Sequence, residues 1–149
     1  MNKPTSLFLA LILLIISGLN INSCSEREET VSCFPNTSIN VILNLNLPAY
    51  YALQTEGNWM YINEQLAGSR GLIVVRTSGG FKIYDRNAPH ICPETNSTLN
   101  VVDNIKITCA ADGAEWILLT GQPLKVAQIP PKMYPYSFNA ANNTLTIYN

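Results

Sequence analysis

Two polar loops in the second half of the chain carry the side chains best suited to chemistry. The first, over residues 85–94, contains His90, the only histidine in the sequence, and the second contains Cys109 and Asp112. Imidazole nitrogen, thiolate sulfur and carboxylate oxygen are all ligands for transition metals. These three residues are therefore the candidate ligands for any metal that the chain holds.

Each loop follows a predicted β-hairpin. Residues 72–84 consist of an apolar run, a glycine-rich turn and a second run with apolar and polar residues in alternation. This pattern is a strong hairpin signal. Residues 99–108 repeat it around a turn at Asp103 and Asn104. Because the second strand of each hairpin leads directly into one loop, we expect the hairpins to present the two loops at one end of the fold.

This layout resembles the cluster-binding part of a Rieske iron–sulfur domain. In that family a Cys-x-His loop and a Cys-x-x-His loop close over a [2Fe-2S] centre. His90 and Cys109 match two of the four ligands. Ala88 stands where the family has the first cysteine, and Asp112 stands where it has the second histidine. The resemblance implies a degenerate, ligand-deficient member of the family.

The rest of the chain also favours β-structure. Apolar and polar residues alternate over residues 39–47, which is typical of a strand with one buried face, and Pro48 ends it. No segment has a helical period. Further strands are predicted at residues 59–62, 115–119, 134–138 and 145–148.

These strands predict an all-β domain over residues 39–149, with about eight to ten short strands in an antiparallel sandwich or small barrel. The T-G-x-P of residues 120–123 is similar to the one that follows the second ligand loop in Rieske domains. Over residues 72–149 the resemblance implies a Rieske-like form of this fold.

The altered ligand positions argue against a cluster. The methyl group of Ala88 cannot bind iron, and Asp112 adds negative charge where the family has a neutral imidazole. We therefore expect no metal or cofactor; the alternative is an electron-transfer protein with an atypical [2Fe-2S] cluster held by His90, Cys109 and Asp112. No catalytic residue is predicted, because Asp112 and Glu115 are typical of acidic residues that face water near a turn.

The resemblance also implies a disulfide. Some Rieske domains join their two loops through a pair of cysteines, and Cys92 matches the first of these, one residue closer to the histidine than in the family. Ala111 occupies the partner position, so the resemblance implies that Cys92 pairs with Cys109 instead. Pairings that use Cys33 remain open, since sequence alone does not determine connectivity.

The N-terminus has the features of a secretory signal peptide. A short N-terminal segment with one lysine leads into an apolar run over residues 7–16, which is shorter than the roughly 20 residues that a membrane-spanning helix needs. Residues 21–24 resemble a bacterial lipobox, so residues 1–23 are the predicted signal peptide and Cys24 the predicted lipidation site. Secretion also implies an oxidising compartment in which disulfides persist.

Residues 24–38 form the predicted lipidated N-terminus and tether. Acyl chains on Cys24 would hold the protein to a membrane, at about 0.8 kcal/mol per buried CH₂. The acidic segment over residues 25–29 is similar to the tag that sends some Gram-negative lipoproteins to the cell surface. We therefore expect a lipid-anchored protein of the outer membrane or cell envelope.

Length and charge limit the remaining functional classes. The chain has 149 residues, a formal net charge of -1 and 13% charged residues, which suits one domain and provides no basic stripe. We therefore expect no nucleic-acid partner. The predicted function is that of a non-enzymatic scaffold or interaction module, whose protein partner the sequence does not indicate.

Overall fold

The computed structural model describes residues 30–149, which form three antiparallel sheets. The first sheet has the order β1 (Asn40–Asn44), β10 (Thr144–Tyr148) and β9 (Tyr136–Asn139). The second has the order β2 (Trp59–Ile62), β3 (Leu72–Thr77) and β4 (Gly80–Asp85). The third runs β5 (Leu99–Val102), β6 (Lys106–Cys109), β7 (Glu115–Ile117) and β8 (Pro123–Lys125). The prediction of an all-β fold with antiparallel sheets is confirmed.

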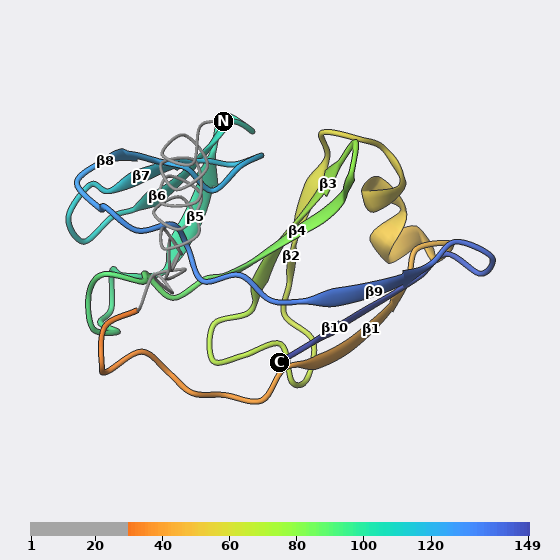
Figure 1. The fold of residues 1–149 in the computed structure, drawn as a ribbon, viewed down its shortest axis with the longest axis horizontal. Helices are drawn as coiled ribbons and strands as arrows, with labels where there is room; N and C mark the ends of the chain where they lie inside the picture. Colours follow the sequence, from red (N-terminus) through yellow and green to blue (C-terminus); the bar gives the residue numbers. More distant parts are fainter. Residues whose placement is uncertain (1–29) are drawn as a thin grey trace, which may run out of the picture.

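The second sheet lies between the other two (Figure 1). Four consecutive residues of β3, from Leu72 to Val75, are fully buried. Leu72 and Val74 pack into one apolar cluster with the first sheet, while Ile73 and Val75 pack into another with the third sheet. A strand buried on both faces needs a continuous apolar run, which explains why β3 does not alternate.

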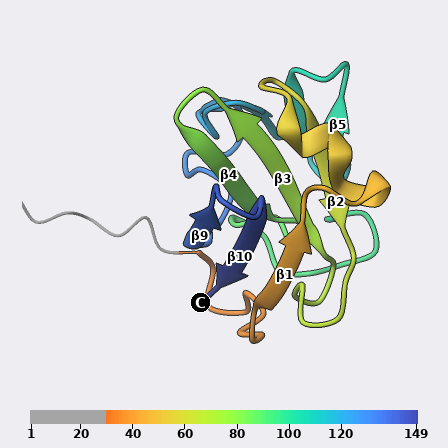
Figure 2. The same ribbon diagram turned by 90° about the vertical axis from the view of Figure 1, so that its right-hand side faces the viewer.

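The first sheet has one buried face and one exposed face. Val41 and Leu43 of β1 are buried, whereas Ile42 between them is 67% exposed. Figure 2 shows β1, β10 and β9 in front of β3 and β4, so the buried face points toward the middle sheet. The alternation in the sequence correctly predicted which side of β1 faces the core.

The structure differs from the sequence prediction at two short elements. A 3₁₀ helix, η1 (Pro48–Gln54), follows the first strand, and it is too short to produce a helical period in the sequence. Its one buried side chain, Leu53, anchors it to the core. The short strand β8 was not predicted; its first residue, Pro123, is tolerated there because β8 is at the edge of its sheet.

Both hairpins lead into the expected loops. The first is formed by β3 and β4, which pair from Leu72↔Asp85 to Thr77↔Gly80, and the second by β5 and β6. The chain leaves β4 at Asp85 and enters the His90 loop, and it leaves β6 at Cys109 and enters the Asp112 loop.

The predicted signal peptide and Cys24 lie outside the described residues. Within residues 30–149, no helix has the length and apolar character to cross a membrane.

Candidate functional site

His90 and Asp112 join the two loops. His90 Nε2 donates a hydrogen bond to Asp112 Oδ2 over 2.5 Å, and the two side chains are 16% and 25% exposed. The second carboxylate oxygen of Asp112 accepts the backbone N–H of Ala114 over 3.1 Å. The His90 ring also lies edge-on to Trp116, with 5.5 Å between ring centres. The imidazole and the carboxylate therefore bind each other.

The hydrogen bonds favour the ionised form of Asp112. Partial burial opposes ionisation of this carboxyl group, but the bonds from His90 and from the Ala114 N–H outweigh burial and lower its pKa. Near neutral pH Asp112 is therefore a carboxylate that accepts hydrogen bonds from both sides. Its charge stabilises the contact between the loops.

Cys109 lies beneath this contact, at the end of β6, and is 1% exposed. Burial raises the pKa of its thiol; the backbone N–H of Ala111 opposes that effect, and the neighbouring Asp112 carboxylate adds to it. A thiolate is the form that attacks electrophiles and binds metals. The surroundings of Cys109 instead favour the neutral thiol, which packs as a small apolar side chain.

Ala88 lies in the same apolar cluster as Cys109. It is 2% exposed and shares the cluster with Leu99, Ile107 and Trp116. At the position where the resemblance places the first cysteine ligand, the structure therefore has a methyl group in the core between the second and third sheets.

The predicted disulfide between Cys92 and Cys109 is wrong. Cys92 pairs with Cys33, with 5.5 Å between their Cα atoms, and Cys109 is the free cysteine among the described residues. The backbone N–H of Val31 donates to the carbonyl of Pro89 over 2.9 Å, so the N-terminal segment lies alongside the His90 loop. Cys33 and Cys92 meet at the surface, whereas the Cys109 side chain points into the core.

Glu115 has a partner other than Asp112. Its carboxylate accepts from the Lys106 ammonium over 2.9 Å across neighbouring strands at the surface. Asp112 and Glu115 thus have different partners, His90 and Lys106.

A buried polar cluster around Asp85 has no counterpart in the sequence prediction. The carboxylate, 1% exposed, accepts from the backbone and side-chain nitrogens of Asn87 over 2.6 and 2.7 Å and from the Tyr134 hydroxyl over 2.7 Å. Burial, strengthened by the Asp85 carboxylate, raises the pKa of Tyr134. Because 49 residues separate Asp85 from Tyr134, no local pattern could have predicted this contact.

The candidate site is a contact between the two loops. Within residues 30–149, no three His, Cys, Asp or Glu side chains are placed to hold a metal ion together. His90 and Asp112 are joined by a hydrogen bond, and the buried Cys109 thiol packs beneath them. No protein-family model matches this chain, and no curated protein matches it significantly.

Proposed function

We propose that this protein is a lipid-anchored cell-envelope protein whose Rieske-like β domain acts as a non-enzymatic scaffold or interaction module. The hydrogen bond between His90 and Asp112 carries the proposal. His90 and Asp112 stand at two of the positions where the resemblance places cluster ligands. Their hydrogen bond joins the two loops that would have to enclose a cluster.

The side chains at the four ligand positions do not fit a [2Fe-2S] cluster. Such a cluster in this family needs two thiolates and two imidazoles. Ala88 offers a buried methyl group, and the surroundings of Cys109 favour the protonated thiol. His90 and Asp112 are directed at each other. We infer that this end of the domain has become a structural junction.

The proposed location in the cell envelope depends on the lipobox-like residues 21–24. Lipid attached to Cys24 would make the membrane one partner of the protein, and the acidic segment that follows would separate the lipid from the domain. A domain held at a surface in this way is suited to recruiting a protein or ligand.

Iron and acid-labile sulfide analysis of anaerobically purified protein, together with a visible spectrum, tests the proposal. We expect colourless protein with neither element. Iron and sulfide in stoichiometric amounts, with a reducible paramagnetic signal, would establish the competing electron-transfer function and overturn the proposal.

A double variant, Ala88→Cys with Asp112→His, provides the matched comparison. It restores the Cys-x-His and Cys-x-x-His ligand set. After reconstitution with iron and sulfide under reducing conditions, we expect visible absorption in the variant and none in the natural protein. Equal uptake by both proteins would mean that Asp112 is a working ligand.

A further inference from the structure

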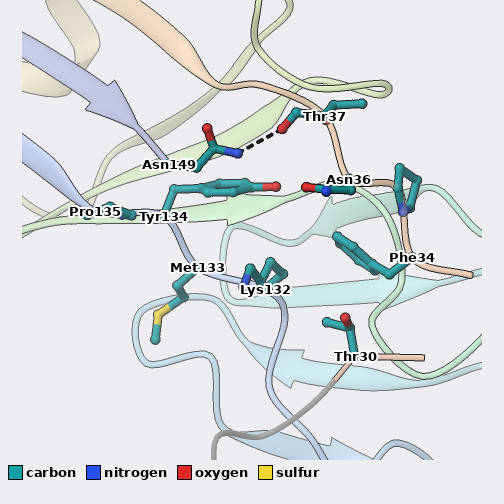
Figure 3. A pocket seen from close by; sticks show the side chains of 10 residues that line it. Thr30, Phe34, Asn36, Thr37, Lys132, Met133, Tyr134, Pro135 and Asn149 are labelled. Carbon is teal, nitrogen blue, oxygen red and sulfur yellow. Dashed lines mark hydrogen bonds between the residues drawn. The ribbon is translucent and has the colours of Figure 1, made fainter. Parts of the chain in front are cut away.

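A cavity of about 460 Å³ is lined by neither His90 nor Asp112. One wall is the N-terminal segment over residues 30–37, and the other is the segment over residues 132–135 that leads into β9. Figure 3 shows Lys132 between the rings of Tyr134 and Phe34, with the side chain of Asn36 facing the Tyr134 hydroxyl. The volume is within the range of about 300–1,000 Å³ that small-molecule sites occupy.

Covalent and hydrogen-bonded links hold the N-terminal wall in place. The Cys33–Cys92 disulfide fixes the residue next to Phe34. At the far end of the wall, Asn149 Nδ2 donates to the Thr37 carbonyl over 2.8 Å, and Asn149 Oδ1 accepts the Ile39 N–H over 3.1 Å. This wall is therefore held at both ends without a ligand.

The second wall is held by β4 and by the buried carboxylate. The Tyr134 N–H donates to the Ile83 carbonyl over 3.0 Å, and the Asp85 N–H donates to the Lys132 carbonyl over 2.8 Å. The Tyr134 hydroxyl donates its proton to Asp85, so toward the cavity its oxygen can only accept a hydrogen bond. The position of the Lys132 backbone is thus set, while its ammonium group is left for other partners.

The polar groups of the cavity include one cation and several groups that can both donate and accept hydrogen bonds. Lys132 is the only charged side chain in the lining, and it takes part in neither salt bridge of the described residues. Within residues 30–149, the Asn36 amide and the Thr30 hydroxyl likewise make no hydrogen bond to the protein. An ammonium group, an amide and a hydroxyl are thus arranged around one space, and each is left for a partner outside the described residues.

The apolar part of the lining provides flat surfaces. Phe34 and Tyr134 contribute aromatic rings, and Pro35 and Pro135 contribute pyrrolidine rings. Flat rings pack against the C–H faces of a ligand, while amide and hydroxyl groups bind its oxygens. Together with one cation, this combination suits a compact ligand that has hydroxyl groups and one carboxylate.

We propose that this cavity binds an acidic monosaccharide, a hexuronate, either free or as a residue of a glycan. The Lys132 ammonium pairs with the sugar carboxylate, a charge-assisted contact that is stronger than a neutral hydrogen bond. The Asn36 amide and the Thr30 hydroxyl bind ring hydroxyls, and a sugar face packs on Phe34. This proposal does not depend on the proposed scaffold function.

Calorimetric titration of the full-length chain with glucuronate, glucose and acetate tests the proposal. We expect glucuronate to bind at least about tenfold more tightly than either glucose or acetate, because glucose lacks the carboxylate and acetate lacks the ring. Binding should weaken as salt is added. Equal affinity for glucose would mean that the Lys132 ammonium does not pair with the sugar carboxylate. Equal affinity for acetate would indicate adventitious anion binding only. Either result overturns the proposal.

Two variants test whether Lys132 and Asn36 contribute to glucuronate binding. Lys132→Met keeps an unbranched side chain and removes the charge, so glucuronate affinity should fall about tenfold or more. The same change at Lys125, exposed on β8 and outside the cavity, should have no effect. Asn36→Asp places a carboxylate at an exposed position of the lining and should abolish binding without affecting folding. Unchanged affinity in both cavity variants would overturn the proposal.

Discussion

His90 Nε2 and Asp112 Oδ2 lie 2.5 Å apart, although 22 residues separate them in the chain. One residue follows a strand of the middle sheet, and the other follows a strand of the third sheet. Their contact therefore adds a polar link between two layers that also share an apolar cluster. It is both the centre of the candidate site and a link in the fold.

Asp112→Asn is expected to lower the free energy of unfolding near neutral pH by about 1 kcal/mol. The substitution keeps an oxygen to accept the Ala114 N–H but removes the charge opposite His90. Because the pKa of Asp112 is lowered in the folded protein, its contribution is present above the ordinary carboxyl range and is lost as pH falls through the folded pKa.

Denaturant unfolding at a series of pH values measures this effect. The difference between natural protein and Asp112→Asn should shrink as the solution is acidified. Glu115→Gln, which removes the same charge from the surface pair with Lys106, is the control and should cost less. A difference for Asp112→Asn that is independent of pH would contradict the assignment.

Joint replacement of Cys33 and Cys92 by serine is expected to lower stability strongly. The disulfide closes a loop with a sequence separation of 59, for which the loop-entropy model predicts up to about 4 kcal/mol. Thermal melting should show the loss, and peptide mapping under non-reducing conditions should recover the Cys33–Cys92 pair. Cys109→Ala, which breaks no disulfide, should be affected much less; a recovered Cys92–Cys109 peptide would refute the pairing.

Gly121→Ala is expected to destabilise the fold by about 1–2 kcal/mol. Gly121 has a φ of +76°, and a Cβ atom there would lie 3.0 Å from the buried Tyr84 ring. The glycine of the T-G-x-P turn is thus needed for both backbone conformation and space. Gly79→Ala is the matched control, because a Cβ atom added at Gly79 would have no neighbour within 4 Å; equal losses at the two sites would argue against this explanation.

Cys24→Ser is expected to abolish labelling by a fatty-acid analogue and to leave an uncleaved or soluble form. The reason is that the proposed lipobox over residues 21–24 would direct the acyl chains to this cysteine. Metabolic labelling followed by membrane fractionation measures the outcome. The control is Cys109→Ala, which leaves both the lipobox and the Cys33–Cys92 disulfide intact. Labelling that survives Cys24→Ser would disprove the lipid anchor.

The sequence by itself determined most of the strands and the positions of the two loops. Alternation over β1, the apolar run of β3 and the turns of both hairpins are local patterns, and a strand's burial depends directly on them. The sequence also singled out His90, Cys109 and Asp112, because their chemistry is visible in the residue types alone.

Only the tertiary structure decided which distant side chains meet. Cys92 pairs with Cys33 because the N-terminal segment crosses the His90 loop, and Cys109 stays unpaired because the last residue of β6 points into the core. The contact between Asp85 and Tyr134 arises in the same way, as β4 and the segment before β9 come together. Local propensity carries no information on such contacts, because they depend on how the layers pack.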